Sequence, residues 1–64
     1  MKEYQILGKD IRITFSALCY MTSMHFDEKV YLFVNEAWEE VMVIPTWWEV
    51  QIVENGKIIV DNQL

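Results

Sequence analysis

The stretch that decides the fold is residues 28–44, EKVYLFVNEAWEEVMVI, in a chain of 64 residues. Its apolar residues recur at steps of three and four, a spacing typical of one face of an amphipathic helix. This stripe consists of Val30, Phe33, Val34, Ala37, Val41 and Ile44. Asp27 is a suitable N-cap, and Pro45 stands where a helix has to end. The stretch therefore predicts a helix from Glu28 to Ile44 that buries Val34, Ala37 and Val41.

The same stretch also fits strands. Many of its residues are β-branched or aromatic, and such residues favour strands. Asn35-Glu36-Ala37 would then form a turn between two strands. In this alternative the whole chain is a small all-β barrel.

A hairpin is predicted on the N-terminal side of this stretch. The segment from Tyr4 to Leu7 leads into Gly8-Lys9-Asp10, which has the composition of a turn. In the next segment the apolar residues Ile11, Ile13, Phe15 and Ala17 alternate with Arg12, Thr14 and Ser16. Alternation of this kind places the apolar side chains on one face of a strand.

A second hairpin is predicted at the C-terminal end. Two apolar runs, Trp47–Val53 and Ile58–Val60, flank Asn55-Gly56, the pair preferred in two-residue hairpin turns. This turn predicts three cross-strand pairs: Glu54 with Lys57, Val53 with Ile58, and Ile52 with Ile59. If Trp47 and Trp48 both lie in the strand, they point to opposite faces.

These elements predict an α+β fold of the order ββαββ, in one domain covering residues 1–64. Two hairpins would form a small antiparallel sheet, and the amphipathic helix would pack on one face of it. Glu36, Glu39 and Glu40 would then lie on the exposed side of the helix.

The charge is acidic and unevenly distributed. The net charge is −5, with ten acidic residues against five Lys and Arg. Between Asp27 and Glu54 the only basic residue is Lys29, against seven acidic ones. Direct binding of nucleic acid needs a basic stripe, and the sequence contains none. The apolar runs are too short to cross a bilayer, so no membrane partner is predicted.

Motifs for catalysis or metal binding are not found. Cys19, His25 and Asp27 are the only ligand types close together, and they lack the paired spacing of zinc sites. The single cysteine cannot form an internal disulfide and favours a reducing, cytoplasmic location. Two isolated glycines cannot build a phosphate-binding loop. The sequence therefore predicts no metal, no cofactor and no enzymatic activity.

The function predicted from these features is that of a small acidic, non-catalytic protein-binding module. The expected contact residues are Glu36, Glu39 and Glu40, which suit a basic partner surface, and Trp47 and Trp48, because tryptophan is enriched in binding hot spots. A sharper hypothesis is an inhibitor or modulator of a larger nucleic-acid-handling protein, in which carboxylates take the place of phosphates. The alternative is a structural protein that self-associates into a homo-oligomer.

Overall fold

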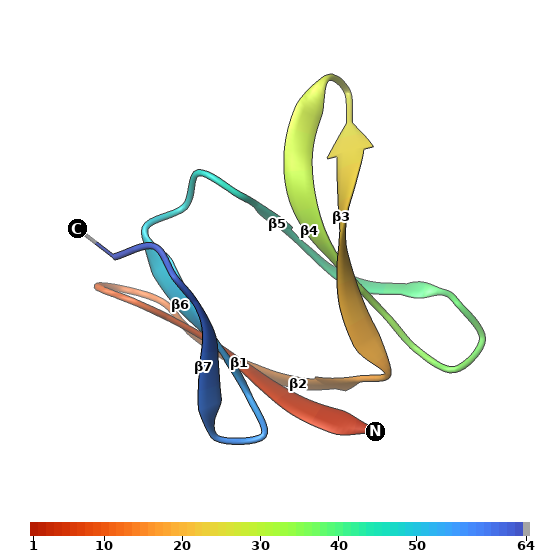
Figure 1. The fold of residues 1–64 in the computed structure, drawn as a ribbon, viewed down its shortest axis with the longest axis horizontal. Coiled ribbons are helices and arrows are strands. Elements are labelled where there is room, and N and C mark those ends of the chain that lie inside the picture. Colours follow the sequence, from red (N-terminus) through yellow and green to blue (C-terminus); the bar gives the residue numbers. More distant parts are fainter. Residues whose placement is uncertain (64) are drawn as a thin grey trace.

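The computed structural model describes residues 1–63, and within them the protein is all-β (Figure 1). Seven strands in this part of the chain form two antiparallel sheets. The strands are β1 (Lys2–Gly8), β2 (Arg12–Ala17), β3 (Cys19–His25), β4 (Glu28–Val34), β5 (Glu40–Pro45), β6 (Val50–Glu54) and β7 (Lys57–Asp61). The first sheet has the order β2-β1-β6-β7, and the second has the order β3-β4-β5.

The chain changes sheets at two places. At Leu18 it bends from β2 of the first sheet directly into β3 of the second. After β5 the loop 46–49 returns it to the first sheet at β6. The β3–β4 hairpin projects beyond the rest of the molecule, at the top of Figure 1. The result is a thin molecule with extents of 34 × 30 × 17 Å.

The predicted helix of residues 28–44 is wrong, and with it the α+β, ββαββ fold class. The stretch forms β4 and β5, joined by a loop at residues 35–39, as in the all-β alternative. β4 is the central strand of its sheet, and both of its faces are covered: Phe33 points into the core, while Val30 and Val34 are buried on the other face. A strand buried on both faces has no alternation of apolar and polar residues, and its apolar run can resemble a helical stripe.

Several details of the helix interpretation fail with it. Asp27 caps no helix; it lies in the turn between β3 and β4, where Phe26 and Asp27 have φ of 50° and 64°. Ala37 and Val41, predicted to be buried, are exposed. Of the three predicted core positions only Val34 is buried.

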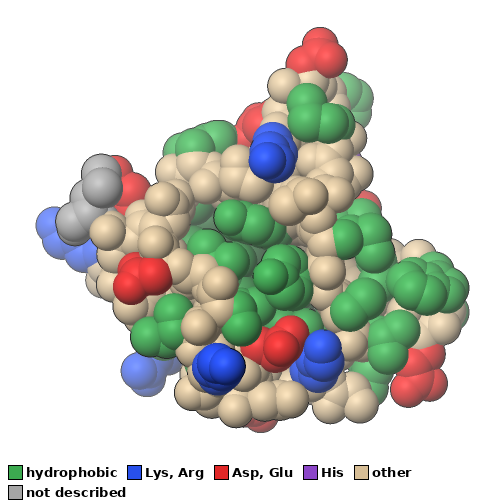
Figure 2. Space-filling model, in the orientation of Figure 1, with side chains coloured by type: hydrophobic (Ala, Val, Ile, Leu, Met, Phe, Trp, Pro, Cys, Tyr) green, Lys and Arg blue, Asp and Glu red, His purple; other side chains and the backbone are tan. Residues whose placement is uncertain are grey.

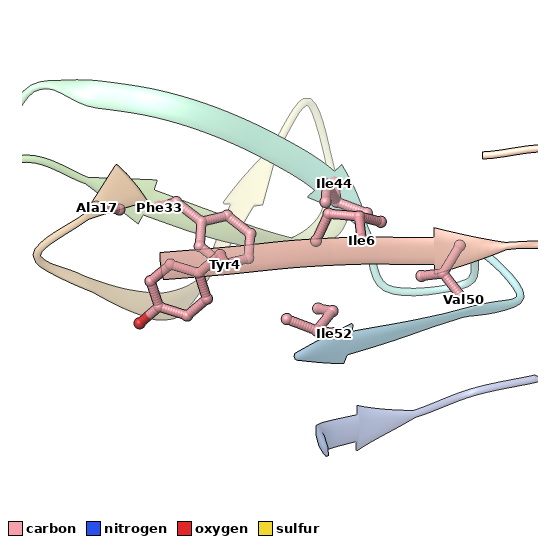
Figure 3. Close-up of a cluster of buried hydrophobic side chains, with 7 residues drawn as sticks. All are labelled: Tyr4, Ile6, Ala17, Phe33, Ile44, Val50 and Ile52. Atoms are coloured by element: carbon pink, nitrogen blue, oxygen red, sulfur yellow. The ribbon is translucent and has the colours of Figure 1, made fainter. Parts of the chain in front are cut away.

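The core lies between the two sheets and is small. Figure 3 shows Tyr4 and Ile6 of β1 pointing toward Phe33 and Ile44 of the second sheet. The ring centroids of Tyr4 and Phe33 are 5.0 Å apart, and those of Phe15 and Phe33 are 4.9 Å apart, both at edge-to-face angles. Such aromatic pairs add to the free energy gained from burial alone. In Figure 2 hydrophobic side chains fill the centre of the view, where the layer between the sheets reaches the surface.

The N-terminal hairpin is confirmed. β1 and β2 pair antiparallel, and the structure sets the register, with Tyr4 opposite Phe15 and Ile6 opposite Ile13. The buried Tyr4 keeps its hydroxyl satisfied by donating to the carboxylate Oε2 of Glu54, 2.6 Å away. Burial of the hydroxyl, and then this hydrogen bond and the charge of Glu54, hold the pKa of Tyr4 well above its usual range. Tyr4 therefore remains a neutral donor in the core.

The C-terminal hairpin is confirmed at its turn and corrected beyond it. Asn55 and Gly56 have φ of 49° and 84°, and Glu54 lies opposite Lys57 as predicted. Val53 also lies opposite Ile58. Ile52, however, pairs with Val60 rather than Ile59, because a β-bulge shifts the register between Ile52 and Val53.

Replacing Gly56 with valine tests this turn. The glycine has open space around it, so the expected cost comes from its positive φ rather than from a clash. A β-branched residue resists this conformation, and Gly56→Val should lower the free energy of unfolding by about 1 kcal/mol or more. Urea denaturation measures the loss, and unchanged stability would contradict the role given to the turn.

Candidate functional site

The five predicted contact residues do not form one site. Glu36, Glu39 and Glu40 lie at the start of β5 and in the loop before it, whereas Trp47 and Trp48 lie in the loop after β5. A strand of this length spans about 20 Å, at ~3.3 Å per residue. In Figure 1 the two loops accordingly appear at opposite ends of β5. Each has to be judged by its own geometry.

Residues 35–40, which are the loop between β4 and β5 together with the first residue of β5, are here named the Trp38 loop. Its backbone is organised by Asn35, whose side-chain Oδ1 accepts from the backbone amides of Ala37 (2.9 Å) and Glu39 (3.0 Å). The Asn35 amide donates to the Glu39 carbonyl (3.0 Å), and the Trp38 amide donates to the Asn35 carbonyl (3.0 Å). Asparagine is suited to this role, because its short side chain can bond to nearby backbone amides. These four hydrogen bonds stabilise the conformation of the loop backbone.

Trp38 stands out within this loop. Its φ is +60°, in the left-handed region that residues other than glycine rarely occupy. Its side chain is 65% exposed. Trp38 therefore combines an unfavourable backbone conformation with an exposed apolar ring that does not pack in the core. Backbone strain of this kind is concentrated at functional sites.

The surroundings of Trp38 are acidic. Glu36, Glu39 and Glu40 are all exposed around it. No Lys, Arg or His occurs between Lys29 and Lys57, so no cation of this stretch neutralises them. On the right of Figure 2, where Figure 1 places the β4–β5 loop, hydrophobic and acidic side chains share one surface. The loop combines one exposed aromatic residue with three exposed acidic residues.

Trp47 and Trp48 lie in the loop 46–49 and not in a strand, so the predicted strand alternation does not apply to them. Trp47 is the exposed one, at 67%, and its Nε1 donates to Oε1 of Glu28 at 2.6 Å. Trp48 packs against the core. Both border a shallow groove of about 320 Å³, whose opposite wall is formed by the β1–β2 turn, residues 8–11. Both rings therefore have contacts within the fold. Within residues 1–63 the ring of Trp38 makes no hydrogen bond and does not pack against the core cluster.

The remaining candidates in the described part of the chain are metal sites, reactive thiols and membrane-spanning helices. Within residues 1–63 no three His, Cys, Asp or Glu side chains gather in a way that could hold a metal ion. Cys19 is a free thiol, half-buried in β3 rather than fully buried. The same residues include no helix with the length and apolar character needed to cross a membrane.

Trp38 was not among the contact residues predicted from the sequence, although it lies inside the stretch interpreted as a helix. The signal that could have found it is Asn35, which begins a turn-forming segment and interrupts the helix pattern. Comparison with protein-family models, curated proteins and solved structures finds no match to this chain. The interpretation of its function therefore rests on the geometry of the Trp38 loop.

Proposed function

We propose that this chain is a small acidic, non-catalytic protein-binding module that contacts its partner through the Trp38 loop. The observation that carries the proposal is the exposed Trp38 in a strained, hydrogen-bonded loop. A contact residue fixed before binding loses little conformational entropy when the complex forms. Tryptophan is also among the residues most enriched in binding hot spots.

The chemistry of the loop defines the partner. An indole ring needs an apolar slot, and three exposed carboxylates around it favour a rim of Arg or Lys on the other protein. An arginine from that rim can also stack on the face of the indole. All three glutamates are exposed rather than buried, which favours binding over acid–base catalysis.

A sharper form of the proposal is that the partner handles nucleic acid. Its basic surface would then meet Glu36, Glu39 and Glu40 in place of phosphates, and the bound module would inhibit or modulate it. The uneven charge of the sequence supports this form, since residues 30–56 contain five acidic residues and no basic one. The single cysteine supports placing this activity in the cytoplasm.

The test begins with affinity capture by the wild-type chain, followed by binding measurements with the purified partner. Replacing Glu36, Glu39 and Glu40 together with glutamine should slow association about tenfold at low salt. The wild-type rate should fall steeply as salt is added, whereas the rate of the triple variant should change little. Stopped-flow or surface-based kinetics give both quantities.

Two controls accompany this experiment. Thermal unfolding of the triple variant should match the wild type, because exposed substitutions cost under about 0.5 kcal/mol each. A short DNA or RNA duplex should compete with the module if the partner surface is a nucleic-acid site. A triple variant that associates as fast as the wild type at low salt would contradict the role of the carboxylates.

A further inference from the structure

We propose that two copies of this chain associate by pairing the outer edges of β3, which joins their second sheets into one continuous antiparallel sheet. β3 pairs with β4 on one side, and within residues 1–63 no strand pairs with its other side. In Figure 1 no other segment lies beside the upper half of β3 on the side away from β4. The inference is independent of the proposed function, because it does not use the Trp38 loop.

The outer edge of β3 lacks the features that protect exposed strands. Proteins guard exposed edge strands with charged residues, proline or bulges, because free edges pair with other chains. In residues 1–63 the other edge strands carry such features: β2 has Arg12, β5 has Glu40 and Pro45, and β7 has Lys57 and Asp61. β5 and β7 also have bulges in their pairing. β3, with the sequence CYMTSMH, has no Lys, Arg, Asp, Glu or Pro, and its pairing with β4 shows no register shift.

The backbone groups of β3 alternate between the side of β4 and the free edge. Hydrogen-bonded and non-hydrogen-bonded pairs alternate along an antiparallel ladder, and a two-residue turn is closed by a hydrogen-bonded pair, here His25 with Glu28. On β4 the Val34 carbonyl accepts from the amide of Leu18, the residue just before β3, whereas the Lys29 carbonyl accepts from the amide of Thr46, which follows β5 on the opposite side. This alternation fits the assignment. The amides and carbonyls of Tyr20, Thr22 and Met24 therefore point away from β4, toward the free edge.

These outward groups match their own copies. If a two-fold axis passes through Thr22, antiparallel pairing places Thr22 opposite Thr22 and Tyr20 opposite Met24 of the second copy. All three outward residues of each copy then lie in hydrogen-bonded pairs. No like charges meet along the ladder, because the strand has no Lys, Arg, Asp or Glu.

The side chains fit the same register. Met24 is 61% exposed in the projecting part of the hairpin, on the face of the sheet that carries Tyr20. Tyr20 is half-buried, at 6.3 Å from the ring of Tyr31 and at the border of the core. In the pair, Met24 of one copy lies against Tyr20 of the other, and thioether sulfur packs favourably on aromatic rings. This contact covers apolar surface that the single chain leaves in water. A second copy is therefore the occupant that the edge fits.

The experiment introduces charges at Thr22, the residue at the proposed two-fold axis. In sedimentation equilibrium at high micromolar concentration the wild type should have twice the chain mass of 7.7 kDa. Thr22→Glu and Thr22→Lys each place two like charges opposite one another, and each should weaken dimerisation at least tenfold. An equimolar mixture of the two variants should dimerise again, because Glu then faces Lys. Thr14→Glu, at an exposed threonine of the edge strand β2, is the matched control and should remain dimeric.

Each outcome decides the proposal. A monomeric wild type would overturn the proposal. It would still be overturned if β3 then proved to pair with a strand of a different protein. Dimers that persist in both Thr22 variants, or a mixture that fails to recover, would place the interface elsewhere. Loss of dimer in Thr14→Glu would point to the β2 edge. Circular dichroism of every variant verifies that the fold is kept, and protection of the Thr22 amide from hydrogen exchange in the wild type would locate the ladder directly.

Discussion

The Phe33→Ala variant is expected to be largely unfolded at room temperature. Phe33 is completely buried and lies at the centre of the aromatic cluster, next to Tyr4 and Phe15. Removing a buried phenylalanine side chain typically costs about 3–5 kcal/mol. A domain of this size rarely has more than about 3–5 kcal/mol of net stability. The single substitution should therefore remove most or all of it.

The matched control is Phe26→Ala, in the turn between β3 and β4. Phe26 is fully exposed and packs on nothing in the core, so its removal should change stability by less than about 0.5 kcal/mol. Far-ultraviolet circular dichroism and urea titration compare the two variants with the wild type. A folded Phe33→Ala protein with near wild-type stability would contradict the core described for residues 1–63.

Local turn chemistry is what the sequence predicts well in this fold. The Asn55-Gly56 turn, the hairpin of β1 and β2, and the pairing of Glu54 with Lys57 all follow from short-range preferences. The β-bulge does not follow from them: Ile59 is the extra residue on β7, between Ile58, which pairs with Val53, and Val60, which pairs with Ile52. The error in the Ile52 partner is confined to the far side of that bulge.

Periodicity alone could not show whether residues 28–44 form a helix or strands. Val30, Phe33 and Val34 fit a helical step, but they belong to a strand that is covered on both faces. Whether a strand is central or at an edge depends on contacts between residues far apart in sequence, which a local pattern does not contain. The β-branched and aromatic composition was the better guide, and it favoured the all-β alternative.

The candidate site was predicted in part. The three glutamates are exposed, as predicted, although they lie in a loop and at the start of β5 rather than on a helix. Trp47 and Trp48 were predicted as contact residues because tryptophan is enriched in binding hot spots. In the fold the indole of Trp47 donates a hydrogen bond to Glu28, and Trp48 packs against the core. The exposure of Trp38 follows from the turn at Asn35. A helix over residues 28–44 has no such turn, so the helix interpretation could not predict this exposure.

Replacing Trp38 with alanine is expected to have the largest effect on binding. A central tryptophan typically contributes more than about 2 kcal/mol, so the dissociation constant for the captured partner should rise at least about 30-fold. Most of this change should appear in the dissociation rate, because the ring makes short-range contacts, whereas charge acts on association. The folded state should be retained, since the side chain is 65% exposed and lies outside the core cluster.

Trp47→Ala provides the comparison for this experiment, because Trp47 is the same residue type at nearly the same exposure, 67%. It lies at the other end of β5, so binding through the Trp38 loop should be close to wild type in this variant. Unfolding midpoints of both variants separate loss of contact from loss of structure. If Trp47→Ala weakens binding and Trp38→Ala does not, the partner binds at the groove beside residues 8–11, and the strain at Trp38 has a purpose other than recognition.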